Sequence, residues 1–215
     1  MSFAMSVFDQ IAKFKVVPVI AIESSDAALL LSDALIEGGL PIAEITFRTE
    51  AAASVIRKMS QERPNLFVGA GTIVTLDNLK AAIDSGAAFG VAPGCNPKII
   101  EAAHKENFPF VPGVCTPSDV EVALANRCKV LKFFPAGVMG GLTMLKSLIA
   151  PYGHMGVQFM PTGGVSPENL REYLTTKGVI ACGGTWIATK EDISEAKWER
   201  IISRCREINT IKTQL

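Results

Sequence analysis

The sequence predicts an α/β fold, a (β/α)8 barrel preceded by a short N-terminal helix. Short apolar runs alternate with longer helix-like stretches eight times, and no long linker or low-complexity segment interrupts them. Successive runs start about 20 to 27 residues apart, close to the minimum for one strand and one crossover helix. A doubly wound open sheet is the alternative, since local periodicity does not exclude it. Eight consecutive units in 215 residues favour the closed TIM barrel, as a single domain over residues 1–215.

The elements of this fold follow in order from the N-terminus. Val7, Ile11 and Phe14 have the spacing of one face of a short amphipathic helix within Met1–Lys15. The eight predicted strands are Val16–Ile22, Ile42–Phe47, Phe67–Thr72, Phe89–Pro93, Phe110–Val114, Val130–Pro135, Val157–Thr162 and Val179–Gly183. Between them, segments such as Asp26–Glu37 carry apolar residues at helical spacing, which predicts the crossover helices.

Several helix boundaries carry local signals. Asn96, Thr116 and Ser166 each place a capping side chain directly before a proline, which suits the first turn of a helix. Gly86 and Gly178 mark returns from a helix to the next strand. These signals predict helices after the fourth, fifth and seventh strands.

Composition excludes several classes of function. Lysine and arginine (21) balance aspartate and glutamate (21), so the chain has no general attraction to nucleic acid or anionic membranes. No apolar run reaches the ~18 residues of a membrane span, and the N-terminus lacks the pattern of a signal peptide. Five cysteines without a CxxC pair predict reduced thiols. We therefore expect a cytoplasmic protein without nucleic-acid or membrane partners.

Metal and nucleotide cofactors are not expected either. His104 and His154 are the only histidines and lie far apart in the sequence, which argues against a histidine-rich metal site. The chain has neither a P-loop nor the glycine fingerprint of dinucleotide-binding folds. Any chemistry should therefore come from the side chains of the protein itself.

The second predicted strand carries a carboxylate and a guanidinium on one face. Because strand side chains alternate, Glu44, Thr46 and Arg48 share one side, and apolar residues occupy the other. In a barrel, the polar side would face the axis near the C-terminal mouth. A salt-bridged pair on an exposed edge strand is the alternative, but the apolar opposite face favours an interior strand. The pattern predicts a binding or proton-transfer site.

The sixth predicted strand carries a single charge, Lys132, within a strongly apolar run. Burial favours the neutral form of lysine, and a neutral amine attacks carbonyl groups. For an isolated lysine, a snorkelling or ion-paired side chain at a strand end is commoner. Here Phe133 and Phe134 continue the strand beyond Lys132, which argues against an end position. A barrel could bring Lys132 opposite Glu44.

Glycine-containing strand ends complete the candidate site. Gly69-Ala70-Gly71-Thr72 ends the third strand, and glycine pairs follow the seventh and eighth strands at Gly163-Gly164 and Gly183-Gly184. Glycines at these last two positions let backbone N–H groups approach an anion, in the usual phosphate position of such barrels. Glycines also occur in ordinary turns, so one pair alone is weak evidence. The prediction of a phosphate site rests on two such pairs in adjacent units.

At these residues the sequence resembles the bacterial 2-keto-3-deoxy-6-phosphogluconate (KDPG) and 4-hydroxy-2-oxoglutarate (KHG) aldolase family of class I aldolases. The resemblance covers nearly the whole chain. Its most specific pieces are Glu44-Ile45-Thr46-Phe47-Arg48-Thr49, Gly69-Ala70-Gly71-Thr72, Lys132-Phe133-Phe134-Pro135-Ala136 and Pro161-Thr162-Gly163-Gly164. The resemblance implies a Schiff-base aldolase that needs no metal or other cofactor, acts on a small 2-oxo acid and assembles as a homotrimer.

The resemblance also implies a role for each matching residue. Lys132 matches the Schiff-base lysine and Glu44 the general acid and base. The implied substrate-binding positions are Arg48 and Thr72 for the pyruvyl carboxylate, Pro93 and Phe134 for the pocket wall, Thr162 for stereochemical choice, and Gly163, Gly164, Gly184 and Thr185 for the phosphate. Thr185 departs from the serine often found in the family, and its extra methyl group narrows or shifts the phosphate pocket.

We therefore expect cleavage of 2-keto-3-deoxy-6-phosphogluconate to pyruvate and glyceraldehyde 3-phosphate. A second expected reaction converts 4-hydroxy-2-oxoglutarate to pyruvate and glyoxylate. One alternative is a phosphate-binding barrel isomerase or synthase that uses Glu44 and Lys132 without a covalent intermediate. Another is a non-catalytic sugar-phosphate-binding barrel, which the cost of burying both charges disfavours.

Overall fold

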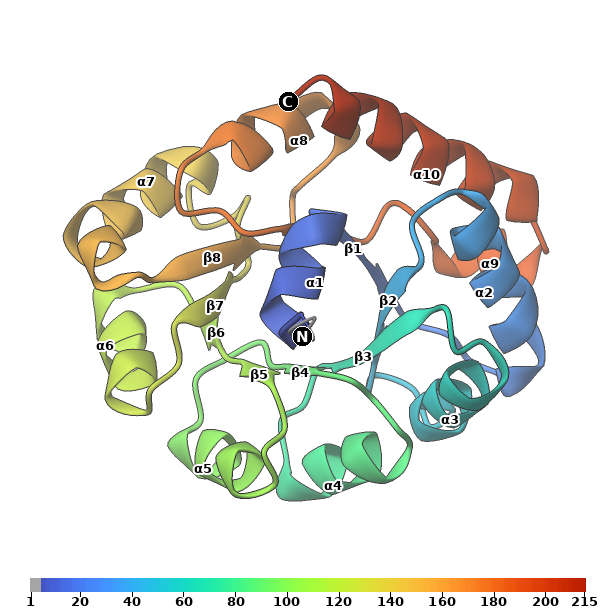
Figure 1. The fold of residues 1–215 in the computed structure, drawn as a ribbon, viewed down its shortest axis with the longest axis horizontal. Helices are drawn as coiled ribbons and strands as arrows, with labels where there is room; N and C mark the ends of the chain where they lie inside the picture. Colours follow the sequence, from blue (N-terminus) through green and yellow to red (C-terminus); the bar gives the residue numbers. More distant parts are fainter. Residues whose placement is uncertain (1–4) are drawn as a thin grey trace.

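The computed structural model describes residues 5–215 as a parallel α/β half-barrel surrounded by helices (Figure 1). One sheet has six strands in the order β5-β4-β3-β2-β1-β9, the other has three in the order β6-β7-β8, and every strand pair is parallel. The strands are β1 (Val16–Ile20), β2 (Ile42–Thr46), β3 (Phe67–Gly71), β4 (Gly90–Val91), β5 (Phe110–Val111), β6 (Gly113–Val114), β7 (Val130–Phe133), β8 (Gln158–Pro161) and β9 (Cys182–Gly184). Because the strands are parallel, their C-terminal ends lie at one edge.

Helices alternate with most of the strands, and all except the first occupy the outer ring in Figure 1. They are α1 (Val7–Phe14), α2 (Ala28–Glu37), α3 (Ala52–Glu62), α4 (Leu76–Asp84), α5 (Pro97–Lys105), α6 (Pro117–Ala125), α7 (Gly141–Tyr152), α8 (Pro167–Thr175), α9 (Lys190–Ser194) and α10 (Trp198–Thr213), with short 3-10 helices at Ser25–Ala27 and Gly153–Met155. Asn96, Thr116 and Ser166 are the N-cap residues of α5, α6 and α8, each followed by proline, which confirms those predicted helix starts.

Two predicted strands are divided in the structure. The fifth, predicted over Phe110–Val114, forms β5 in one sheet and β6 in the other, interrupted at Pro112, which has no N–H group to donate to a strand ladder. The eighth, predicted to start at Val179, first makes an isolated bridge to Phe159 and only from Cys182 onward pairs with β1 as β9. The remaining predicted strands each contain an observed one, with shorter ends.

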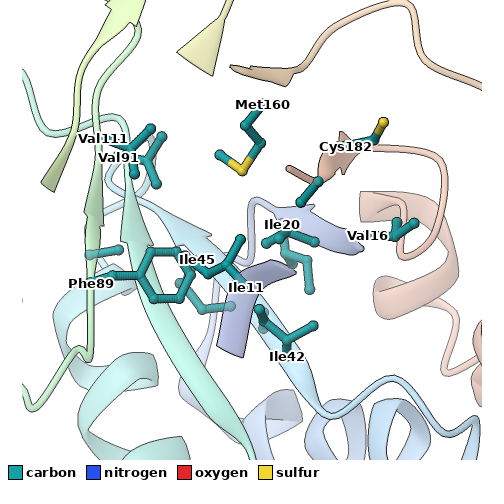
Figure 2. Close-up of a cluster of buried hydrophobic side chains, with 14 of the residues drawn as sticks. Ile11, Val16, Ile20, Ile42, Ile45, Phe89, Val91, Val111, Met160 and Cys182 are labelled. Atoms are coloured by element: carbon teal, nitrogen blue, oxygen red, sulfur yellow. The ribbon is translucent and has the colours of Figure 1, made fainter. Parts of the chain in front are cut away.

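The N-terminal helix α1 lies at the centre of the ring in Figure 1. Its predicted residues Val7, Ile11 and Phe14 fall within it, while Met1–Ala4 lie outside the described residues. Ile11 is fully buried, and Figure 2 shows it among the core side chains of the sheet. Phe14 stacks on Phe67, with ring centroids 6.3 Å apart. The helix therefore packs against the apolar core inside the ring.

The hydrophobic core is continuous across the described residues. Buried side chains from both sheets and from the inner faces of the helices belong to one cluster, part of which Figure 2 shows around Ile20, Ile45 and Phe89. Within residues 5–215, none of the helices combines the length and apolar character needed to cross a bilayer. The buried polar residues Glu44, Thr46, Lys132 and Thr162 stand out against this apolar background.

Candidate active site

Lys132 and Glu44 are in direct contact. They lie on β7 and β2, in different sheets, and Lys132 Nζ donates a hydrogen bond of 3.1 Å to Glu44 Oε1. Their side chains are only 6% and 0% exposed. Because burying an ion pair is costly, such a pair is weak evidence for stability and favours a functional role. Oε2 of Glu44 has no hydrogen-bond partner among residues 5–215, so it can accept a bond from a ligand hydroxyl group.

The glycines of β3 make room for side chains that point into the interior. In the β2–β3 register, Thr46 pairs with Gly71 and Glu44 with Gly69. A Cβ atom on Gly71 would lie 2.7 Å from Cγ and 2.8 Å from Cδ of Glu44. One on Gly69 would lie 2.5 Å from a ring carbon of Phe89. The Gly-Ala-Gly sequence is therefore required by the packing of Glu44 and Phe89, a reason that the sequence alone did not reveal.

Arg48 and Thr72 follow β2 and β3 at the C-terminal edge. Arg48 is exposed, and its Nε donates to Thr46 Oγ1 at 3.1 Å, while Thr46 Oγ1 donates to the carbonyl of Ile20 at 2.9 Å. Thr72 is half-buried and has a φ of +59°. A β-branched residue with positive φ is strained, and such strain clusters at functional sites. Both residues thus occupy the edge at which the sequence analysis expected a carboxylate site.

Phe134 and Pro93 follow β7 and β4 at the same edge. The ring centroid of Phe134 is 5.4 Å from Lys132 Nζ, within the range of a cation–π interaction. Gly163 approaches the same ring, since a Cβ atom on it would lie 3.4 Å from Phe134 Cε2. Pro93 follows β4 and is half-buried beside β6, where the N–H of Gly113 donates to the carbonyl of Gly94 at 3.1 Å. Phe134 therefore lies between the lysine and the glycine pair of the seventh strand end.

Thr162 and the first glycine pair lie at the end of β8. Thr162 is 1% exposed and bridges to Gly183, where a Cβ atom would lie 2.9 Å from Thr162 Cγ2. Gly163 and Gly164 have φ values of +83° and +86°, a region that favours glycine. A Cβ atom on Gly164 would lie 2.8 Å from Gly137 Cα. These glycines are thus required by backbone conformation and close packing, whatever ligand they receive.

The second glycine pair, Gly183-Gly184, lies at the end of β9. The ring of Trp186 packs against Gly184 on the side where a side chain would stand, with Cη2 2.8 Å from an ideal Cβ position. Thr185, which lies between Gly184 and Trp186 in the sequence, is exposed. Trp186 was not among the predicted site residues, although an aromatic residue two positions after a glycine pair is a visible signal. The end of β9 therefore carries the exposed Thr185 between Gly184 and the packed ring of Trp186.

Other reactive side chains do not join this cluster. Burial raises the pKa values of Cys95 and Cys128 to about 11 and of Cys205 to about 12, so these thiols stay protonated at neutral pH. His104 on α5 and His154 in a 3-10 helix are exposed. Within residues 5–215, no three His, Cys, Asp or Glu side chains form a group that could hold a metal ion. The chemistry available here is that of an amine and a carboxylate.

Comparison with known proteins identifies the family. A family model described as KDPG and KHG aldolase matches residues 7–204. The 2-dehydro-3-deoxy-phosphogluconate aldolase of Haemophilus influenzae is 43% identical over 94% of both chains.

Two solved structures extend the comparison. The crystal structure of KDPG aldolase from Legionella pneumophila, with pyruvate captured at low pH as a covalent carbinolamine intermediate, has a TM-score of 0.89. It is 33% identical and covers 95% of this chain and 98% of that one. The aldolase of Zymomonas mobilis, solved with 3-phosphoglycerate, has a TM-score of 0.85 and 34% identity over 95% of both chains. On the evidence of sequence and fold together, this chain belongs to the KDPG and KHG aldolase family.

Proposed function

We propose that this protein is a class I aldolase that cleaves 2-keto-3-deoxy-6-phosphogluconate to pyruvate and glyceraldehyde 3-phosphate. The observation that carries this proposal is the buried contact of 3.1 Å between Lys132 Nζ and Glu44 Oε1. An amine supplies the covalent catalysis, and a carboxylate beside it supplies the proton transfers. Family membership and the covalent pyruvate adduct of the Legionella relative support the same chemistry.

The reaction begins with attack of the neutral Lys132 amine on the C2 ketone, which forms a carbinolamine. Protonated Glu44 donates a proton to the departing hydroxyl group, so that water leaves and an iminium forms. Glu44 then accepts the C4 hydroxyl proton while the C3–C4 bond breaks and its electron pair moves into the iminium, giving an enamine and the free aldehyde. Glu44 returns the proton to C3, and hydrolysis releases pyruvate and restores Lys132. Such proton transfers contribute about 10²–10⁴-fold to the rate.

We assign the substrate-binding roles by residue. Arg48 and Thr72 hold the pyruvyl carboxylate, and Pro93 and Phe134 form the pocket wall. Thr162 contributes to stereochemical choice, and the phosphate is received by Gly163, Gly164, Gly184 and Thr185. The position of Phe134 between Lys132 and Gly163 supports a substrate that runs from the lysine towards the glycine pairs. The same site accepts 4-hydroxy-2-oxoglutarate, giving pyruvate and glyoxylate.

We propose further that the two sheets are parts of one closed (β/α)8 barrel, formed by a single domain over residues 1–215. Backbone pairing at both junctions supports this: Gly113 N donates to Gly94 O on one side, and Thr162 bridges to Gly183 on the other. We also propose that the protein is a homotrimer, that it is located in the cytoplasm and that it acts without a cofactor. Light scattering of the purified protein tests the trimer.

Reductive trapping tests the covalent step. Incubation with pyruvate and borohydride should add the mass of one reduced pyruvate to the peptide that contains Lys132. Lys129→Arg is the matched control, because Lys129 lies three positions earlier at the exposed start of the same segment and should leave trapping unchanged. Lys132→Arg should abolish it. Turnover without trapping would favour the non-covalent isomerase or synthase, and ligand binding without turnover would favour a binding module.

A further inference from the structure

The loop of residues 185–189, between β9 and α9, is held from two sides; we call it the β9–α9 loop. From within, the ring of Trp186 packs on Gly184. From outside, Arg204 of α10 reaches the loop, and its Nη1 donates to the carbonyl of Ile187 at 3.3 Å. Figure 1 shows α10 (red) in the outer ring beside α9. The loop that carries Thr185 is therefore tied to a helix distant from it in the sequence.

Asp192 is the centre of this attachment. Its side chain is 2% exposed, and Oδ2 accepts hydrogen bonds from Thr189 Oγ1, at 2.6 Å, and from Arg204 Nη1. Its backbone N–H in turn donates to Thr189 Oγ1 at 3.2 Å. Arg200 adds a longer and more exposed ion pair of 3.6 Å. One nitrogen atom of Arg204 thus joins the buried carboxylate to the carbonyl of Ile187 in the middle of the loop.

Asp192 is a buried charge whose partner, Arg204, is partly exposed, with 29% of its side chain accessible. Removing the carboxylate from water is expensive, so the pair is weak evidence for stability. What the pair adds is geometry, since charge-assisted hydrogen bonds to fixed partners hold a loop in one conformation. The loop held here carries Thr185, one of the residues proposed to receive the phosphate. Preorganising this loop would favour binding of a ligand group there.

We propose that Asp192 and Arg204 are positioning residues that set the affinity of the site for the phosphate group of the substrate. They act through the β9–α9 loop and take no part in the imine chemistry at Lys132. The inference rests on the proposed function, because it assumes that Thr185 and its neighbours receive the phosphate. It assigns substrate preference to residues that do not touch the substrate.

The test compares three variants on α10. Arg204→Ala removes the contact to the carbonyl of Ile187 in the loop and the contact to Asp192 on α9. Arg204→Lys keeps the charge, and because both contacts come from a single nitrogen atom, an ammonium group with its three donors can restore them. Arg206→Ala is the matched control, since Arg206 lies on the same helix but pairs with Glu37 in an exposed contact of 2.9 Å. Thermal unfolding identifies any variant that fails to fold.

Four quantities are measured for each variant: kcat and KM for 2-keto-3-deoxy-6-phosphogluconate, the inhibition constant of inorganic phosphate, and the rate of pyruvate trapping by borohydride. Arg204→Ala should raise KM and the inhibition constant by about tenfold or more, as expected when a binding group is displaced by a fraction of an ångström to 1 Å. Its kcat and pyruvate trapping should stay within about twofold of the wild type. Arg204→Lys should recover most of the affinity, and Arg206→Ala should match the wild type.

The outcomes separate the two proposals. If the wild type traps no pyruvate, the proposed function is wrong. If it traps pyruvate, but Arg204→Ala leaves both phosphate-dependent quantities unchanged, the positioning role is overturned and the proposed function stands. Equal losses in kcat, trapping and phosphate affinity would show that the pair is only structural, which also overturns the inference. If Arg204→Ala does not fold, Asp192→Asn is measured in its place, because it weakens the same attachment. A folded Asp192→Asn variant with weaker phosphate inhibition and unchanged trapping supports the role, and one with unchanged phosphate inhibition overturns it.

Discussion

Gly71→Ala should impair catalysis by displacing Glu44 while leaving the fold in place. An alanine Cβ atom would lie 2.7 Å from Cγ and 2.8 Å from Cδ of Glu44, and closer still to Oε1. Ordinary van der Waals contact begins at 3.4 Å, so Cγ of Glu44 has to move by about 0.7 Å or more, and the carboxylate that it carries is displaced with it. The backbone of Gly71 lies outside the left-handed region, so alanine adds no conformational strain there.

The size of the effect follows from this displacement. Glu44 is fully buried, so its shift disturbs a packed neighbourhood, and overpacking of this kind costs about 1–3 kcal/mol of stability. A misplacement of ~1 Å of a reacting group lowers rates by about 100-fold, equivalent to about 2.7 kcal/mol of transition-state stabilisation. The three nearest atoms given for the new methyl group all belong to Glu44. The loss should therefore appear mainly in kcat, with KM changed by less than about threefold.

Pyruvate release, coupled to lactate dehydrogenase, gives kcat and KM, and thermal unfolding gives the change in stability. Gly94→Ala is the matched control: Gly94 lies at the end of a neighbouring strand, and a Cβ atom on it meets nothing within 4 Å. It should keep kcat and the unfolding midpoint close to those of the wild type. A folded Gly71→Ala variant with normal kcat would refute the reasoning, because Glu44 could then not be the precisely placed proton carrier.

Lys132→Arg should lose measurable pyruvate release, because a guanidinium stays protonated and cannot form an imine, while circular dichroism shows an intact fold. Arg48→Ala should raise KM for the substrate by about tenfold with little change in kcat, because a charge-assisted contact to the pyruvyl carboxylate is lost; steady-state kinetics checks this split. Thr72→Gly should raise KM for pyruvate-derived substrates yet leave the unfolding midpoint equal or higher, since glycine adopts a φ of +59° without strain. Burial raises the pKa of Asp192, but hydrogen bonds from Thr189 and Arg204 and the charge of Arg204 outweigh it and lower the pKa below its usual value. The wild type should therefore be more stable than Asp192→Asn at pH 5 and above, and denaturant titrations should show this advantage shrinking as pH falls below ~4 through the native pKa.

For each of these four variants, a specific result would contradict the prediction. Substantial turnover by Lys132→Arg would exclude the covalent mechanism, and a fall in kcat alone for Arg48→Ala would move that residue from binding to chemistry. A lower unfolding midpoint in Thr72→Gly would mean that the threonine side chain stabilises more than its backbone costs. A stability difference for Asp192→Asn that does not change between pH 2 and 7 would show that the carboxylate gains nothing from ionisation in the folded state.

Much of the fold could be predicted because its signals are local. The side chains of Asn96 and Thr116 accept from backbone N–H groups two or three residues away, and the N–H of Ser166 donates to Asn169 Oδ1, three residues on. These helix starts are therefore specified by adjacent residues. The same holds for the strands, whose apolar runs are visible without knowing their partners. The division of the fifth predicted strand at Pro112 depended on which neighbours its two halves meet, and that information is not local.

Residue types and their near neighbours were enough to predict the alternation of strands and helices and to single out Lys132 and Glu44, because side-chain chemistry and strand alternation are local properties. The contact of 3.1 Å between the amine and the carboxylate, 88 residues apart, could be seen only in the folded chain. The tertiary structure also decided the reasons for the glycines, since Gly71 yields space to Glu44 and Gly184 to Trp186. The ion pair between Asp192 and Arg204 is likewise a contact that only the folded structure shows. Such contacts depend on how distant segments pack in three dimensions, and no local pattern along a chain specifies that distance.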